Sequence, residues 1–113
     1  MDKLALKRVF YNKSKYGNVK TKVDDILFDS KKEANRYCQL KLLARAGTIS
    51  ELELQPRFDL VVNGFKICTY IADFRYIKDN KIIIEDVKGV QTQEFKLKKK
   101  LMKAVHGIDV LIS

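Results

Sequence analysis

Apolar side chains recur with helical spacing in two segments of the chain. Over residues 30–46, Ser30 and Glu33 fit a capping box at the start and Gly47 suits the end. The apolar stripe of this segment comprises Ala34, Tyr37, Cys38, Leu42 and Leu43. A second stripe runs over residues 92–106, and Gly107 follows it as a stop. The pattern therefore predicts two amphipathic helices, at 30–46 and 92–106.

Most of the remaining segments alternate between apolar and polar residues, as strands do. Asn63-Gly64 is a strong hairpin turn, and Pro56 predicts a bend in the strand region before it. A hairpin within Val19–Phe28, turning at Asp24-Asp25, is also expected. The other expected strand segments are Ile49–Val62 as one or two strands, Phe65–Ile77, Lys81–Lys88 and Ile108–Ile112. The order of these elements predicts an α/β fold of the α+β kind, with helices on a mixed sheet.

Composition adds a preference for an anionic partner. The chain has 113 residues, 23 of them Lys or Arg and 14 Asp or Glu, so its formal net charge is +9. This length predicts a single domain, with a basic N-terminal arm at 1–29 and a folded core at 30–113. The charge favours DNA or RNA as partner ahead of an anionic membrane surface. A solvated terminus is the alternative interpretation of the arm.

Several classes of function are disfavoured by what the sequence lacks. It has no apolar run near the length of a membrane span and no signal-peptide core at its start, so we expect a cytoplasmic protein without a membrane partner. Cys38 and Cys68 lie alone in apolar segments and are expected to be reduced. With His106 as the single histidine, a structural zinc site is disfavoured. No glycine-rich phosphate loop is present, so no nucleotide cofactor is expected.

Two aspartates carry the strongest chemical signal. If the loop at Asp79-Asn80 is symmetric, paired positions of the two strands sum to 159, and Asp73 faces Asp86. Lys88, two residues further on, points to the same face as Asp86. Two carboxylates this close repel each other unless a cation compensates, and hard oxygen ligands suit Mg²⁺ or Mn²⁺. A surface salt-bridge ladder at a strand end is the alternative.

The residues at this hairpin also resemble a known motif. Asp73 followed by Asp86-Val87-Lys88, with Glu33 on an earlier helix, is similar to the PD-(D/E)XK nuclease superfamily. The resemblance covers about residues 30–113 and implies a restriction-endonuclease-like core of helix, three antiparallel strands, helix and strand. Ala72 stands where that motif often has proline. Within the superfamily, the chain further resembles a small phage-encoded family of uncharacterised function, of Holliday-junction-resolvase-like type. The stretches that carry this second resemblance are 28–34, 55–58, 72–74 and 85–89.

The resemblance implies roles for individual residues. Asp73 and Asp86 would bind the metal together with the Val87 backbone carbonyl, and Glu33 would reach it directly or through water. Lys88 would contact the scissile phosphate and orient the attacking water. Glu33 has a competing interpretation as the acid of the Ser30 capping box.

Two further residues are candidates for supporting positions around this site. Gln55 and Glu85 are candidates to support the metal ligands from beside them. Glu85 exchanges roles with Asp86 only if the loop is asymmetric by one residue.

Basic residues outside this motif are candidate DNA contacts. Five lysines of the second predicted helix, at 96, 98, 99, 100 and 103, are expected to form one basic face, with a solvated face as the alternative. The candidate DNA-binding residues are Lys13, Lys15, Lys20, Lys22, Arg57, Lys96, Lys98 and Lys99. The strand edges at Ile108–Ile112 and Phe65–Tyr70 are candidate surfaces of a homodimer.

Together, residues and resemblance predict a divalent-metal-dependent DNA endonuclease that hydrolyses phosphodiester bonds. Such a protein would be phage- or prophage-encoded, would act in the cytoplasm of a bacterial host, and could take branched DNA as substrate. The alternative is a non-catalytic basic nucleic-acid-binding module on a nuclease-like fold. Asp73 and Asp86 discriminate between these two hypotheses. A protein that only binds nucleic acid gains nothing from carboxylates where phosphate approaches, because they repel it.

Overall fold

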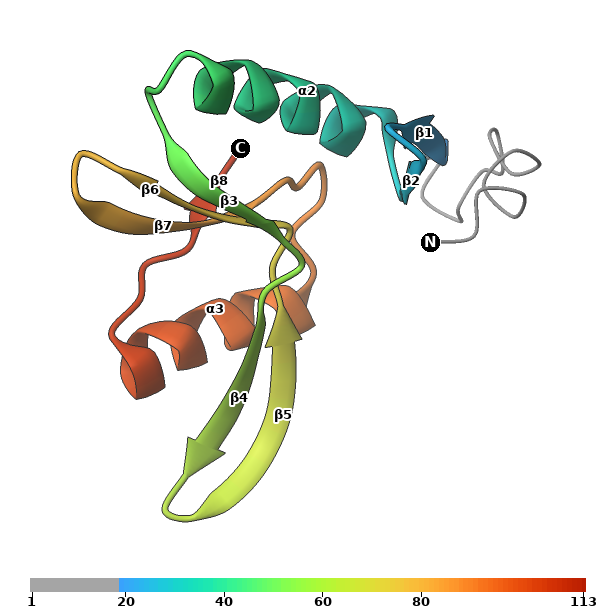
Figure 1. Ribbon diagram of the computed structural model, residues 1–113. Helices are drawn as coiled ribbons and strands as arrows, with labels where there is room; N and C mark the ends of the chain where they lie inside the picture. Colours follow the sequence, from blue (N-terminus) through green and yellow to red (C-terminus); the bar gives the residue numbers. More distant parts are fainter. Residues whose placement is uncertain (1–18) are drawn as a thin grey trace. The chain divides into compact units, whose positions relative to one another are not determined.

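The structure is a computed structural model that describes residues 19–113 (Figure 1). The chain divides into two compact units, a first unit that ends at Leu43 and a second unit that spans Ala44–Ser113. The sequence predicted an arm at 1–29 and a core at 30–113. The two compact units do not test that division, so it stays a prediction.

The first unit begins with the short hairpin that the sequence predicted. Strand β1, Thr21–Val23, pairs antiparallel with β2, Ile26–Phe28. The turn residues Asp24 and Asp25 have φ angles of 53° and 61°, in the left-handed region that tight hairpin turns require. Aspartate tolerates that region better than most residues, which explains why two acids form this turn.

Helix α2, Lys31–Arg45, confirms the first predicted helix. The Ser30 hydroxyl accepts a hydrogen bond from the Glu33 backbone N–H at 3.0 Å, which is the N-cap half of the expected capping box. Tyr37 of α2 is buried against Phe28, and its hydroxyl donates to Asp24 at 3.0 Å. Lys41 of α2 also contacts the Asp24 carboxylate, at 2.9 Å. Apolar and polar contacts therefore both join the hairpin to the helix of the first unit.

The second unit contains a four-stranded mixed sheet, ordered β3-β6-β7-β8. Neighbouring strands are antiparallel except for the last pair, in which β8 runs parallel to β7. The strands are β3 Ser50–Leu54, β6 Phe74–Lys78, β7 Lys81–Asp86 and β8 Leu111–Ile112. This arrangement confirms the expected mixed α+β class.

A two-stranded hairpin is formed by β4, Arg57–Val62, and β5, Phe65–Ile71. Its turn is the predicted Asn63-Gly64 pair, with φ angles of 51° and 82°. Figure 1 shows this hairpin extending away from the four-stranded sheet, with helix α3, Gln93–His106, beside its base. His106, at the end of α3, has its Nε2 atom 2.9 Å from the Asp59 carbonyl of β4. This contact ties the end of the helix to the hairpin.

Helix α3, Gln93–His106, confirms the second predicted helix. The Thr92 hydroxyl accepts from the Phe95 N–H, and Gly107 ends the helix in the left-handed conformation, at φ 69°. Residues of α3, both sheets and the segment before β8 form the core of the second unit. The buried members of this core are Leu60, Tyr70, Ala72, Ile84, Phe95, Met102 and Val110.

Three predicted strands have different bounds in the structure. The single strand expected over Phe65–Ile77 is wrong, because the chain leaves β5 at Ala72 and starts β6 at Phe74. The Ala72 N–H donates to the Pro56 carbonyl, and the Asp73 N–H donates to the Glu85 carbonyl, so the change of partner strand occurs between these two residues.

The other two strands are shorter than expected. The strand over Lys81–Lys88 ends at Asp86, and the strand over Ile108–Ile112 is reduced to Leu111–Ile112. Within residues 19–113, no helix is long and apolar enough to cross a membrane.

Candidate functional site

Two aspartates meet where β6 begins and β7 ends. Lys78 pairs with Lys81 and Phe74 with Glu85, which confirms the register in which paired positions sum to 159. Asp73 directly precedes β6 and Asp86 is the last residue of β7. The ladder ends at the Phe74–Glu85 pair, and Asp73 and Asp86 are the next residues along the two strands, in the order that the symmetric loop predicted.

Asp86 is almost completely enclosed, with an exposed fraction of 1%. One carboxylate oxygen accepts a hydrogen bond from the Tyr70 hydroxyl. The other oxygen lies 3.6 Å from the Lys88 Nζ atom. Because an ionised buried carboxylate is costly without partners, these two contacts explain how Asp86 is tolerated there.

Lys88 lies between the acid and an aromatic ring. Its Nζ atom is 3.6 Å from Asp86 and 4.6 Å from the centroid of the Phe95 ring of α3. Its side chain keeps 30% of its surface exposed. The ammonium group also borders an open pocket of about 260 Å³, whose lining includes Tyr70 and Lys98. Lys88 is therefore the charged group of this site that an external anion can reach.

Asp73 is held by the backbone of the neighbouring strand end. Its carboxylate accepts a hydrogen bond from the Val87 N–H at 2.7 Å. Its own carbonyl accepts from the Gln55 N–H at 3.0 Å. Asp73 is thus positioned by the segment that joins Asp86 to Lys88, which couples the three residues of the motif.

Tyr70 completes this cluster, and the sequence did not indicate it. The pKa of the Tyr70 phenol lies above its usual value, mainly because the phenol is buried. The hydrogen bond to Asp86 and the negative charges of Asp86 and Asp73 raise this pKa further. The phenol therefore stays protonated and acts as a hydrogen-bond donor.

Glu85 occupies the opposite face of β7. It is fully buried, and its two carboxylate oxygens accept hydrogen bonds from the Tyr76 hydroxyl at 2.6 Å and the Ser113 hydroxyl at 2.7 Å. The symmetric register excludes the exchange of roles between Glu85 and Asp86 that an asymmetric loop would have produced. Glu85 therefore ties β6 to the chain after β8 and does not join the pair of aspartates.

The remaining predicted site residues lie in different places. Glu33 is buried in α2 of the first unit, so its assignment as a metal ligand stays a prediction. Gln55 is exposed at the junction of β3 and β4 and contacts Asp73 through its backbone. Arg57 is exposed at the start of β4. Lys22 forms an ion pair with Asp25 at 3.5 Å.

The candidate DNA-binding lysines divide into separate groups. Lys13 and Lys15 lie outside the described residues. Lys98 pairs with Glu94 at 3.4 Å and borders the same pocket as Lys88, whereas Lys96 and Lys99 line a different pocket. The expectation that all five lysines of α3 form one basic face is wrong for Lys98, because its position on the helix turns it to the other flank.

The donor atoms present are compatible with a hard cation but do not form a large acidic cluster. Across residues 19–113, no group of three or more His, Cys, Asp or Glu side chains is positioned to hold a metal ion. The second unit contributes the two carboxylates of Asp73 and Asp86, beside the Val87 backbone. Carboxylate and carbonyl oxygens are the ligands that Mg²⁺ prefers, so the donor chemistry fits this ion.

The sequence of this chain matches one known protein family. It belongs to the family described as "Protein of unknown function (DUF1064)", which matches residues 13–109. Comparison with the curated proteins gives no match, and comparison with the solved structures gives none either. The matched range includes helices α2 and α3, strands β1 to β7, and every residue of the acidic site.

Proposed function

We propose that this member of the DUF1064 family is a divalent-metal-dependent DNA endonuclease. The observation that carries the proposal is the junction at which β6 begins and β7 ends. There the Asp73 carboxylate accepts from the Val87 N–H, next to Asp86, and Lys88 lies 3.6 Å from Asp86. Two acids and a lysine in this arrangement suit phosphodiester hydrolysis, in which negative charge develops on the phosphate. The resemblance to the PD-(D/E)XK nuclease superfamily supports the same chemistry.

Mg²⁺, or Mn²⁺ in its place, is the proposed cofactor. Asp73 and Asp86 would hold it with their carboxylates and Val87 with its carbonyl, and Glu33 would add a ligand directly or through water. When bound, the ion would polarise the phosphate and lower the pKa of a bound water. The ion would also offset the repulsion between the two aspartates.

The chain's own residues would prepare the site in three ways. Lys88, which borders the open pocket, would contact the scissile phosphate and orient the attacking water. Tyr70 would keep one Asp86 oxygen oriented through its hydrogen bond. The Val87 N–H would hold the Asp73 carboxylate in place. Each role requires the side chain to stay in its present position, and burial of Asp86 and Tyr70 favours that.

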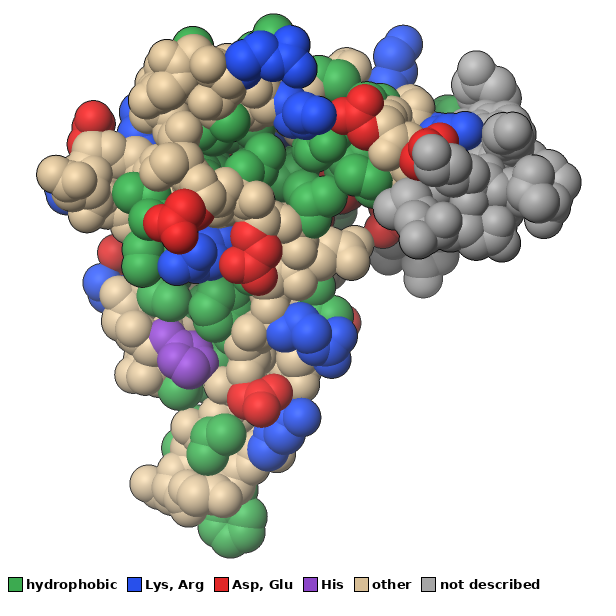
Figure 2. Space-filling view, viewed as in Figure 1, with side chains coloured by type: hydrophobic (Ala, Val, Ile, Leu, Met, Phe, Trp, Pro, Cys, Tyr) green, Lys and Arg blue, Asp and Glu red, His purple; other side chains and the backbone are tan. Residues whose placement is uncertain are grey.

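DNA is the proposed partner because of the net charge of +9 and the basic residues outside the acidic pair. We further propose a homodimer, since two copies would place two sites on strands of opposite polarity. The exposed apolar residues Phe65 and Ile67 of β5, with exposed fractions of 74% and 56%, are the surface proposed for pairing. Figure 2 shows exposed hydrophobic side chains at this hairpin, at the bottom of the view.

A second candidate is a DNA-binding protein without catalysis. It is favoured by the engagement of both Asp86 oxygens, one by Tyr70 and one by Lys88. It is also favoured by the absence of a third acid beside Asp73 and Asp86 within residues 44–113. On this hypothesis, the Asp86–Lys88 pair would act as a structural ion pair.

A cleavage assay separates the two candidates. Duplex, single-stranded and four-way-junction DNA would each be incubated with the protein in Mg²⁺, in Mn²⁺ and in EDTA. The nuclease proposal expects cleavage of at least one substrate in the presence of either ion and none in EDTA. DNA binding without cleavage under all conditions would support the second candidate.

A further inference from the structure

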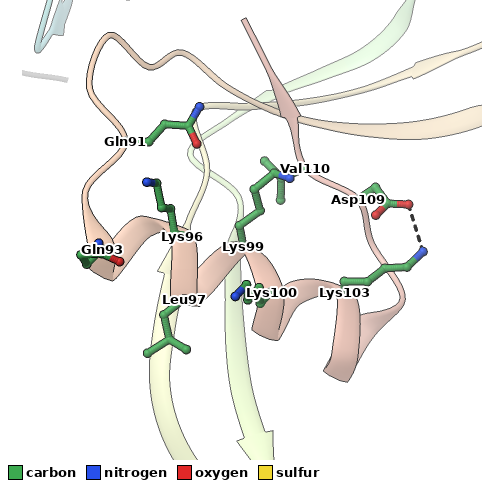
Figure 3. Close-up of a pocket in the computed structure, with 9 residues that line it drawn as sticks. All are labelled: Gln91, Gln93, Lys96, Leu97, Lys99, Lys100, Lys103, Asp109 and Val110. Carbon is green, nitrogen blue, oxygen red and sulfur yellow. Dashed lines mark hydrogen bonds and ion pairs between the residues drawn. The ribbon is translucent and has the colours of Figure 1, made fainter.

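A second pocket lies on the side of α3 that faces away from Lys98. It has a volume of about 570 Å³ and is lined by the helix together with residues before it and before β8 (Figure 3). Four lysines of α3 line it, at positions 96, 99, 100 and 103. In Figure 3, the Lys99 side chain runs from the helix toward Val110, and Gln91 lies across the pocket from the helix.

The charge of this pocket is mostly uncompensated. Lys103 is paired with Asp109 at 2.9 Å. Among the residues that the structure describes, Lys96, Lys99 and Lys100 form no ion pair. Three ammonium groups held on one helical surface repel each other, and a bound anion removes that repulsion.

Helix geometry explains why these four lysines act as a group. Their spacing of three, four and seven residues puts them on one face, one to two turns apart. The row from Lys96 to Lys103 extends about 10 Å along the helix axis, at 1.5 Å per residue. A DNA strand carries one phosphate per about 3.4 Å of axial rise, so the row spans about three successive phosphates.

The pocket is separate from the acidic site. Lys98 and Glu94 lie on the other flank of α3, in the pocket that contains Lys88. Between the two flanks, Phe95 and Met102 bury the helix against the core. An anion bound by Lys96 and Lys100 is therefore not the phosphate that Lys88 contacts.

We infer that the Lys96–Lys103 pocket binds phosphates of the DNA backbone, at a surface separate from the acidic site. The inference rests on the proposed function in taking DNA as the ligand, but not on cleavage or on a metal. Compact lysine ammonium groups with little base-reading geometry suit phosphate oxygens, and they position DNA without reading its sequence.

Two double variants of equal charge change test this inference. Lys96→Gln/Lys100→Gln removes two exposed lysines of the pocket, and glutamine keeps their helix propensity. Lys78→Gln/Lys81→Gln is the control. It removes two exposed lysines that lie opposite each other in the register of β6 and β7, beside their turn. Binding of labelled duplex and four-way-junction DNA is measured in EDTA over a range of salt concentrations.

The pocket variant is expected to reduce the slope of log K against log salt by about two, at about 0.9 per phosphate contact. The control variant is expected to reduce this slope by less than the amount that corresponds to one phosphate contact, about 0.9. Equal reductions in both variants, no reduction in either, or no DNA binding by the wild-type chain would overturn the inference.

The same measurements separate this inference from the proposed function. If no DNA is cleaved in Mg²⁺ while the slope still falls selectively in the pocket variant, the nuclease proposal fails and the pocket assignment stands. If cleavage occurs and the two variants bind alike, the nuclease proposal stands and the pocket assignment fails.

Discussion

The Tyr70 hydroxyl donates a hydrogen bond to the Asp86 carboxylate, and this bond joins the two sheets of the second unit. Tyr70 belongs to β5 of the hairpin, and Asp86 ends β7 of the four-stranded sheet. Both residues are buried. The orientation of the acid therefore depends on how the hairpin packs on the sheet.

Substitution of Tyr70 by phenylalanine should lower the free energy of unfolding. The variant leaves a buried Asp86 oxygen without this donor, which costs about 1–3 kcal/mol. Denaturant unfolding at neutral pH measures this loss. A variant as stable as the wild type would show that the hydrogen bond contributes nothing to the fold.

The same variant should change the alkaline limb of the stability profile. The folded-state pKa of Tyr70 is raised above the unfolded value of 10.0. The stabilisation is therefore complete below about pH 10 and is lost as pH rises above it, because only the unfolded state releases the proton. The wild type should lose up to about 1.4 kcal/mol per pH unit more than Tyr70→Phe between about pH 10 and 11. Tyr37 and Lys41 titrate alike in both proteins, so the difference between the curves isolates Tyr70.

Asp86→Asn should reduce Mg²⁺-dependent cleavage by at least about 100-fold, because it removes a proposed metal ligand. DNA binding should stay equal or become tighter, since a negative charge is lost. Asp79→Asn is the matched control, because Asp79 is exposed in the β6–β7 turn and asparagine tolerates its φ of 52°. Rates come from gel-based cleavage of the best substrate. Undiminished cleavage by Asp86→Asn would refute the site.

Mg²⁺ should stabilise the wild type and Glu85→Gln by the same increment, but not Asp86→Asn. A ligand that binds only the folded state raises stability by mass action, so loss of a metal ligand removes the increment. Glu85→Gln disturbs the hydrogen bonds from Tyr76 and Ser113 and should cost about 1–3 kcal/mol with or without the ion. Thermal unfolding across a Mg²⁺ titration provides the comparison. An increment retained in Asp86→Asn would argue against metal binding by this acid.

Sedimentation at micromolar concentration should reveal a species of twice the 13.1 kDa chain mass. Phe65→Ser/Ile67→Ser should shift it to the monomer, since exposed apolar surface would no longer be buried between copies. Ile82→Ser, which changes an exposed aliphatic residue of β7, is the control and should leave the dimer intact. A monomer alone and on junction DNA would contradict the proposed pairing.

Local chemistry accounts for the features that could be predicted from the sequence. The turns at Asp24-Asp25, Asn63-Gly64 and Asp79-Asn80 use residues that tolerate positive φ, and all three have it. Because side chains alternate with a period of two, the last of these turns determined the β6–β7 register, at whose end Asp73 and Asp86 are the next residues. Glycine at position 107 likewise predicted the end of α3.

Other features depend on contacts between distant segments. The break between β5 and β6 comes from the Ala72 and Asp73 amides, which donate to Pro56 and Glu85. An alternating apolar pattern continues across this break, so periodicity alone joined the two strands.

The sequence by itself determined which acids share a face, because register within one hairpin follows from its turn and the pleat of its strands. The tertiary structure alone decided that Tyr70 reaches Asp86, since their strands belong to different sheets. The tertiary structure also decided that Lys98 lines the same pocket as Lys88, whereas Lys96 lines another pocket. Helix periodicity separates Lys98 from Lys96. Packing of Phe95 and Met102 in the core then fixes which flank of α3 borders the pocket that contains Lys88.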